Sequence, residues 1–395
     1  MLTSKKALPL IVISQFLCTS LWFAGNGVSN DIISSFNLNQ NTVSYLITSV
    51  QFGFIFGTLL FALLFITDRF SPSTIFFVCS LLGATFNLGI LLENNTLTSL
   101  VVFRFLTGFS LAGIYPVGMK IAADYFNEGL GKSLSWLVGA LVLGTAFPHF
   151  LKLISGNYSW TYVIFSTSIL AVLGGLLILF FIPKGPYYKT NSKPGLNNIF
   201  RVFKNKKFSQ AAIGYFGHMW ELYTFWAFVP IFISIYNSLH SGSNLSIPLF
   251  SFIIIGSGSI ACIVGGYLSS CFGTKKTATY FLISSGICCL TSPFFFYSSI
   301  FIFLSFMIFW GATVIADSPL FSSLIAKNTE PESKGTALTI INCIGFSITI
   351  ISIQTLSYLQ SITQSNYILL ILAIGPIFGV INLMKEHKTQ KFRAS

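Results

Sequence analysis

The sequence predicts an all-α membrane protein of twelve transmembrane helices arranged as two six-helix bundles. The first indication is composition: 53% of the 395 residues are hydrophobic and only 8% are charged, against about 25% charged residues in soluble globular proteins. The second is a series of twelve long apolar runs, and the third is the gathering of basic residues in the short loops between them. So few charges cannot cover a soluble fold, and we therefore expect the apolar surface to face lipid.

The twelve runs have the length that a membrane span requires, since an α-helix needs about 20 apolar residues to cross the bilayer core. The first run follows Lys5 and Lys6 as a signal peptide would, but it continues to Ala24 without an obvious cleavage site, so a retained helix is predicted. The seven cysteines lie in or beside these runs without paired or metal-ligand spacing, and no disulfide, metal or cofactor is predicted. The predicted spans are 7–27, 42–66, 72–92, 97–123, 132–155, 159–183, 208–236, 246–269, 276–297, 299–326, 335–359 and 366–384.

The basic residues predict the orientation of these spans. With the N-terminus in the cytoplasm, 20 of the 22 Lys and Arg residues fall on the inner side, Lys152 falls outside, and Arg104 lies within a helix. Cytoplasmic loops carry such an excess, so both termini are expected in the cytoplasm. Because the basic residues lie in these loops, the net charge of +12 is explained without a nucleic-acid partner, and none is predicted. High Phe, Ile, Asn and Ser usage is typical of an AT-rich genome and favours a bacterial inner membrane.

The longest loop, 184–207, divides the chain into a first bundle at 1–183 and a second bundle with a cytoplasmic tail at 208–395. The loop contains no acidic residue and is predicted to be a basic cytoplasmic linker. Its end places apolar residues on one helical face, which indicates a short helix on the anionic inner leaflet; a disordered tether is the alternative. The residues of that face are Leu196, Ile199, Phe200 and Phe203.

The two halves repeat each other at an offset of about 203 positions. Four matches in separate regions share this offset, and two more follow after a one-residue gap. We interpret the repeat as the duplication of a six-helix unit in one orientation, which gives two bundles related by an axis along the membrane normal. The matched pairs are Ala24 with Ala227, Phe70 with Phe272, Gly108 with Gly311, Pro116 with Pro319, Gly131 with Gly335, and Leu134 with Leu338.

These features together resemble the major facilitator superfamily. That family carries a charged, glycine-containing motif in the loop between the second and third spans and repeats it between the eighth and ninth. The first copy here keeps Asp68, Arg69 and Phe70, but Leu64 and the run Ser71-Pro72-Ser73 replace its glycine and basic positions. The second copy keeps Gly266, Leu268, Phe272, Gly273, Lys275 and Lys276, with Ser270 in place of the acid, and helix 4 carries Arg104-x-x-x-Gly108. The resemblance implies a cytoplasmic gating latch at Asp68, Arg69, Gly273 and Lys275; a tight polar turn is the alternative for Asp68 and Arg69.

Few ionisable residues lie inside the predicted spans, and such residues are functional by default. Glu221 and His218 lie three apart in 208–236 and so share a helical face. Burial disfavours the charged form of a carboxyl group, so Glu221 is expected to exchange a proton, with His218 as partner or relay. Mutual bonding that only fixes helix packing is the alternative for this pair.

Asp317 and Arg104 lie in the spans 299–326 and 97–123. Asp317 could act in binding or bond backbone groups freed by Pro319, and Arg104 could bind a substrate anion or bond carbonyls of adjacent helices. The resemblance implies that helices 1, 4, 7 and 10 line a central cavity. An aromatic, polar-tipped substrate site would be completed there by Asn26, Gln15, Tyr115, Trp220, Tyr223 and Trp226.

The predicted function is secondary transport of a small polar or charged organic solute by alternating access and proton-coupled symport, by a monomer in contact with membrane lipid. An inorganic-anion porter of the nitrate/nitrite type is the alternative within transport. A resemblance to that subfamily would imply an arginine in the second span and another in the eighth, but 42–66 and 246–269 contain no Arg or Lys, so this alternative is disfavoured. No enzyme is predicted, since motifs such as His-Glu-x-x-His are absent. A non-transporting membrane sensor is the further alternative, although no loop is long enough to hold a soluble sensing domain.

Overall fold

The computed structural model describes residues 4–39, 42–126, 130–156, 159–188, 203–330, 334–363 and 365–385, and in these ranges it contains helices and no strand. Eleven helical segments are long and apolar enough to span a membrane, and the shorter apolar helix Ala7–Thr19 brings the number to twelve. The all-α, twelve-helix prediction is confirmed. The elements are α1 (Ser4–Thr19), α2 (Ser29–Ser35), α3 (Thr42–Leu63), α4 (Ile66–Arg69), α5 (Pro72–Leu88), η1 (Gly89–Leu91), α6 (Leu97–Leu111), α7 (Tyr115–Tyr125), α8 (Leu130–Ser155), α9 (Thr161–Phe181), α11 (Lys206–Leu239), α12 (Ile247–Phe272), α13 (Thr274–Phe295), α14 (Ile300–Ala316), α15 (Ser318–Lys327), α16 (Lys334–Ile362), η4 (Asn366–Ala373) and α17 (Ile374–Met384).

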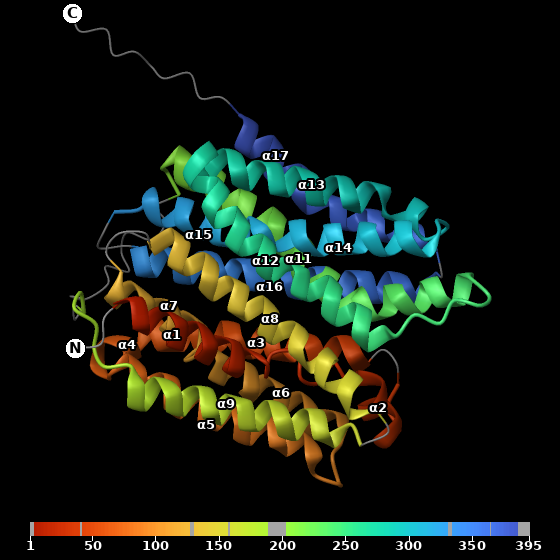
Figure 1. Ribbon diagram of the computed structural model, residues 1–395, viewed down its shortest axis with the longest axis horizontal. Coiled ribbons are helices and arrows are strands. Elements are labelled where there is room, and N and C mark those ends of the chain that lie inside the picture. Colours follow the sequence, from red (N-terminus) through yellow and green to blue (C-terminus); the bar gives the residue numbers. More distant parts are fainter. Residues whose placement is uncertain are drawn as a thin grey trace, which may run out of the picture.

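The helices lie in two groups, which we call the first half (α1–α9) and the second half (α11–α17); Figure 1 shows them one above the other. The main contacts between the halves join α8 to α12 and α3 to α16. Asn205 caps α11, because its side chain accepts hydrogen bonds from the backbone N–H groups of Lys207 and Phe208. Most of the predicted amphipathic linker helix, including Leu196, Ile199 and Phe200, lies outside the described residues.

Three of the spans are discontinuous. The first helix stops at Thr19 and continues as turns before α2, whereas an unbroken span was predicted to residue 27. The fourth and tenth spans each consist of two helices, α6 with α7 and α14 with α15, and Pro116 and Pro319 stand in the first turn of the second piece. Proline lacks a backbone N–H and disfavours helical geometry in the preceding residue, so both halves break at matching positions of the repeat.

Two matching glycines allow close packing within each half. A Cβ atom at Gly108 of α6 would overlap the carbonyl oxygen of Val50 in α3, and one at Gly311 of α14 would overlap that of Ile254 in α12. Val50 and Ile254 are themselves 204 positions apart. The predicted duplication therefore extends from sequence matches to contacts between the second and fourth helices of each half.

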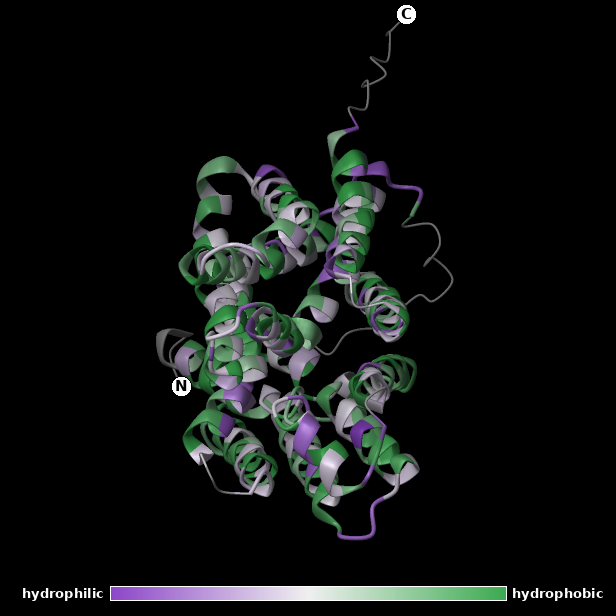
Figure 2. Cartoon of the chain, turned by 90° about the vertical axis from the view of Figure 1, so that its right-hand side faces the viewer, coloured by the Kyte–Doolittle hydropathy of each residue, from purple (hydrophilic) through white to green (hydrophobic). Residues whose placement is uncertain are grey.

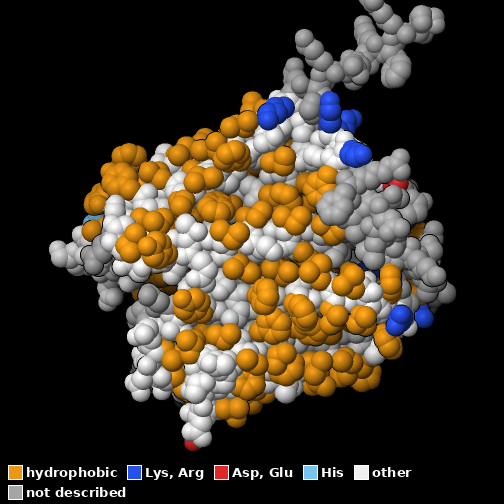
Figure 3. Space-filling model, turned by 180° about the vertical axis from the view of Figure 1, so that it is seen from behind, with side chains coloured by type: hydrophobic (Ala, Val, Ile, Leu, Met, Phe, Trp, Pro, Cys, Tyr) orange, Lys and Arg blue, Asp and Glu red, His pale blue; other side chains and the backbone are white. Residues whose placement is uncertain are grey.

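The outer surface is apolar in the way that lipid requires. Large side chains such as Phe180, Phe294 and Phe301 are 72%, 67% and 81% exposed, and hydrophobic residues colour most of the helices seen end-on in Figure 2. Figure 3 shows hydrophobic side chains across the middle of one face, with Lys and Arg at its upper and right-hand margins. This distribution is that of a multi-pass membrane protein.

Candidate substrate and proton site

Helix α11 positions most of the residues singled out in the sequence. It contacts α12, α14, α15, α16 and α17 of its own half, and its side chains are buried along most of its length. His218 and Glu221 face α13, α14 and α15, as described below, whereas Tyr223 and Trp226 face the first half. Helix α11 thus carries a polar face toward its own bundle and an aromatic face toward the other.

His218 forms an ion-pair contact with Asp317 at the break of the tenth span. The distance from His218 Nδ1 to Asp317 Oδ1 is 2.8 Å, and both side chains are 1% exposed. Asp317 is the residue between α14 and α15. A buried carboxylate needs a partner of opposite charge or a proton, and this contact supplies one while linking α11 to the junction of the tenth span.

Glu221 has other partners than the predicted one. Its Oε1 accepts a hydrogen bond of 2.6 Å from Trp310 Nε1 in α14, and its Oε2 accepts one of 2.9 Å from Ser285 Oγ in α13. The hypothesis that Glu221 pairs with His218 is therefore corrected. The two residues share a helical face, but Glu221 bonds side chains of α13 and α14, whereas His218 contacts Asp317. Because the donors to Glu221 are neutral, its carboxyl group can gain or lose a proton without breaking an ion pair.

Arg104 donates hydrogen bonds to the backbone of the discontinuous first span. Its guanidinium donates hydrogen bonds to the carbonyl oxygens of Leu21, at 3.3 Å, and Trp22, at 2.6 Å. Both carbonyls lie in the turns that follow α1. The sequence left two roles open for Arg104, binding a substrate anion and bonding carbonyls of adjacent helices, and this geometry agrees with the second.

Asn26 lies beside Arg104, away from the residues of α11. Both line a cavity of about 10 Å³ that is bounded by first-half residues, including Gly25 and Ser29, and the side-chain N–H groups of Asn26 have no hydrogen-bond partner within the described ranges. Such a volume holds about one water molecule. The structure therefore places Arg104 and Asn26 together in the first half, apart from His218, Glu221 and Asp317 in the second.

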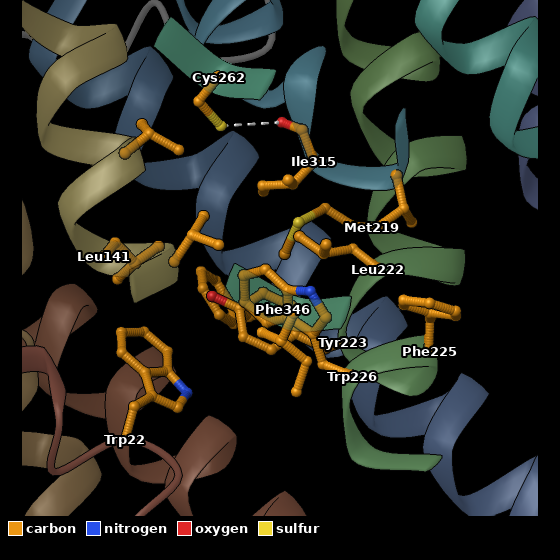
Figure 4. Close-up of a cluster of buried hydrophobic side chains, with 14 of the residues drawn as sticks. Trp22, Leu141, Met219, Leu222, Tyr223, Phe225, Trp226, Cys262, Ile315 and Phe346 are labelled. Atoms are coloured by element: carbon orange, nitrogen blue, oxygen red, sulfur yellow. Dashed lines mark hydrogen bonds between the residues drawn. The ribbon is translucent and has the colours of Figure 1, made fainter. Parts of the chain in front are cut away.

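Six aromatic rings lie between these groups, and we call them the interface cluster. Trp22 and Tyr223 have ring centroids 5.8 Å apart, Trp22 and Phe346 5.6 Å, and Tyr223 and Trp226 5.2 Å. Figure 4 shows Trp22 of the first half facing Tyr223, Trp226 and Phe346 of the second. The cluster consists of Trp22, Phe23, Phe54, Tyr223, Trp226 and Phe346.

Four members of this cluster were missed in the sequence: Trp22, Phe23, Phe54 and Phe346. A signal for one of them was present, since the offset of 203 that matches Ala24 with Ala227 also matches Phe23 with Trp226. These two rings meet edge to face with centroids 6.2 Å apart. The repeat thus brings equivalent positions of the first and seventh spans into contact.

Tyr115 and Trp220 differ in their relation to the cluster. Tyr115, the first residue of α7, packs against the buried core and lies within electrostatic reach of Tyr223. Trp220 Nε1 donates to the carbonyl oxygen of Ile371 in η4 at 2.9 Å. Trp220 therefore fixes the start of the last span instead of lining the cluster.

Of the predicted gating residues, Gly273 and Lys275 have contacts that lie within the second half. Gly273 joins α12 to α13 with φ of +88°, a conformation that glycine tolerates best, and Lys275 Nζ donates to Gln210 Oε1 in α11 at 3.2 Å. Arg69 is exposed, and the side chain of Asp68 lies outside the described residues. At this end of the molecule Lys132 makes a contact between the halves, with its Nζ 5.1 Å from the ring centroid of Tyr267.

Comparisons with known proteins bear on the whole chain. The sequence model of the Major Facilitator Superfamily matches residues 11–353, and no curated protein sequence matches. Among solved structures, a variant of the nucleoside transporter NupG has 15% identity and a TM-score of 0.71, over 95% of this chain and 98% of that one. The MFS proton:xylose symporter XylE has 14% identity and a TM-score of 0.74, over 95% of this chain and 94% of that one.

Proposed function

The chain belongs to the Major Facilitator Superfamily, and from this premise we propose that it is a symporter that moves a small polar organic solute together with a proton by alternating access. The two halves, proposed to be 1–183 and 208–395 with a cytoplasmic linker at 184–207, would rock about a site between them. Both termini would face the cytoplasm of a bacterium, because the basic residues lie on one side. The protein would act as a monomer surrounded by lipid.

The observation that carries this proposal is the buried His218–Asp317 contact at the break of the tenth span. Transporters of this kind place their sites at discontinuous helices near the midplane. Protonation of Asp317 would remove its charge attraction to His218 and free α15 to move relative to α11. Glu221, three residues along α11 from His218, supplies a second carboxyl group that can carry a proton.

Two further observations favour an organic solute over an inorganic anion. Arg104 donates to the carbonyl oxygens of Leu21 and Trp22, so part of its hydrogen-bonding capacity is already used within the first half. The two solved relatives carry a nucleoside and xylose, according to their descriptions. Both are small polar organic molecules.

The test is proton uptake into proteoliposomes that contain a trapped pH-sensitive dye. D-xylose, uridine, lactate and alanine are added in turn, and the wild-type chain is expected to acidify the lumen with at least one of them. Glu221→Gln is expected to abolish this acidification while solute exchange persists. Gln can keep both contacts of Glu221, because its oxygen accepts from Trp310 and its amide can donate to Ser285 Oγ, a hydroxyl that both donates and accepts.

Glu93→Gln is the matched control, since Glu93 is exposed in the loop between η1 and α6, and it should retain wild-type acidification. Asp317→Asn should lose acidification as Glu221→Gln does. Wild-type acidification in both Glu221→Gln and Asp317→Asn would refute the proton-coupling role of these carboxyl groups.

A further inference from the structure

We propose that the interface cluster is the solute-contacting surface and that it takes an uncharged, ring-shaped solute bearing hydroxyl or carbonyl oxygens, the chemistry shared by sugars and nucleosides. This inference rests on the proposed transport function and adds the substrate class. Three independent features of the cluster carry it: unpaired neutral donors, the lack of a charged residue among its members, and flat rings contributed by both halves.

The first feature is a pair of indole N–H groups without acceptors. Trp22 and Trp226 are 1% and 0% exposed, and within the part of the chain that the structure describes neither Nε1 atom has a hydrogen-bond partner. Buried polar groups in native proteins are nearly always paired, and leaving a donor unpaired is costly. A solute oxygen between the halves would supply the missing acceptors.

Unpaired amides extend this neutral polar character beyond the rings. Gln51 in α3 is fully buried, and neither its Oε1 nor its Nε2 has a partner among the described residues. It lies three positions before Phe54 of the interface cluster and therefore on the same face of α3. The amide offers both a donor and an acceptor, which suits hydroxyl groups.

The second feature is that no member of the interface cluster carries a charge, since all six are Trp, Phe or Tyr residues. The acidic groups reached from α11 have partners within the second half: Asp317 contacts His218, and Glu221 accepts from Trp310 and Ser285. A charged solute among the rings would lose its hydration without a charged member of the cluster to pair with, which is unfavourable. The site chemistry therefore selects an uncharged solute.

The third feature is the shape of the cluster. The Trp22 ring lies at 26° to Phe346 and at 30° to Tyr223, so aromatic faces from opposite halves lie at small angles to each other. Aromatic faces pack well against the flat apolar face of another ring. The rings touch in this structure, so a solute enters between them when the halves separate, and binding is thereby linked to alternating access.

The experiment is calorimetric titration of the purified full-length protein with D-xylose and uridine as uncharged ring solutes, and with lactate and glutamate as charged ones. The wild-type chain is expected to bind D-xylose or uridine and neither anion; the two uncharged arms distinguish sugar from nucleoside. Trp22→Phe and Trp226→Phe each keep a ring and remove one N–H donor. Each should weaken binding about 2- to 10-fold, the effect of one neutral hydrogen bond.

Trp136→Phe is the matched control, because Trp136 is 38% exposed on α8, and it should bind as the wild type does. Binding of a charged solute only, binding of none of the four, or unchanged affinity in both Trp22→Phe and Trp226→Phe would each overturn the inference. The outcome is separable from that of the proposed function. Binding of D-xylose without its movement into vesicles would refute transport alone, whereas lactate-driven proton uptake would refute the substrate class alone.

Discussion

Arg104 is a buried cation whose partners are main-chain carbonyls instead of acidic side chains. It bonds the carbonyl oxygens of Leu21 and Trp22 in the turns after α1, and it lies beside Gly25, where an added Cβ atom would lie 3.5 Å from its Nε. Trp22 belongs to the interface cluster. Arg104 therefore positions a ring of the cluster through the backbone and does not need to touch the solute.

Replacing Arg104 with Met should lower stability because two carbonyl oxygens lose charged donors inside the protein. A hydrogen bond to a charged group contributes about 1.5–3 kcal/mol, so we expect a loss of roughly 3 kcal/mol, measured as a fall in the midpoint of thermal unfolding in detergent. Arg69→Met, at an exposed position, should leave the midpoint unchanged. If Arg104→Met kept its midpoint and lost only the stabilisation by bound D-xylose or uridine, Arg104 would be a solute ligand instead.

Gly108 and Gly311 should be equally intolerant of a side chain, since they occupy equivalent places in the repeat. In each case the added Cβ atom would meet a backbone oxygen, Val50 for one and Ile254 for the other, and a backbone atom in a packed helix cannot move aside cheaply. Overpacking of this kind costs about 1–3 kcal/mol. We expect Gly108→Ala and Gly311→Ala to lower the unfolding midpoint by similar amounts.

Gly256→Ala is the control for this pair, because its Cβ atom would have ordinary contacts at 3.9 Å and alanine favours the helix. It should be neutral or slightly stabilising. Strongly unequal effects at Gly108 and Gly311 would contradict the equivalence of the two helix pairs.

The long helices were predictable from the sequence, whereas their breaks and irregular turns were not. Hydropathy alone placed spans such as 246–269 close to the observed Ile247–Phe272, because a membrane helix must be long and apolar. The turns after Thr19 and the 3₁₀ segment Asn366–Ala373 were not predicted. Both depend on tertiary partners, Arg104 in the first case and Trp220 in the second, that no local pattern encodes.

The sequence named some residues of the candidate site, but it did not predict their contacts. Spacing correctly placed His218 and Glu221 on one face of α11, since three residues make nearly one helical turn. It could not say which neighbour each would meet, because Asp317, Ser285 and Trp310 come from three other elements whose rotation about α11 is fixed by packing. The ring contacts between the halves were likewise invisible to any single-helix pattern.

The molecule as a whole is closed by different contacts at its two ends. At the end that holds α4 and α15, Lys132 of the first half lies over the ring of Tyr267. At the other end, Gln354 of α16 reaches across to α3: its Nε2 donates to Thr48 Oγ1 at 3.0 Å, and its Oε1 accepts from Ser44 Oγ at 3.4 Å. Alternating access requires these two closures to open in turn, so weakening one should bias the population toward opening at that end.

Gln354→Leu keeps the approximate size of the side chain and removes both hydrogen bonds across the interface. Each neutral hydrogen bond contributes about 1 kcal/mol, so losing one or both should favour the state open at that end about 5-fold or more. The measurement is the distance distribution between spin labels at Glu93→Cys and Ser241→Cys, exposed positions in loops of opposite halves. The exposed Cys271 is replaced by Ser to keep the labelling specific.

Gln360→Leu on the same helix is the matched control and should leave the distribution as in the wild type. A longer-distance population that grows in Gln354→Leu alone would identify the Gln354 contacts as the closure of that end; identical distributions in the two variants would mean that the packing of α3 against α16 closes it without them.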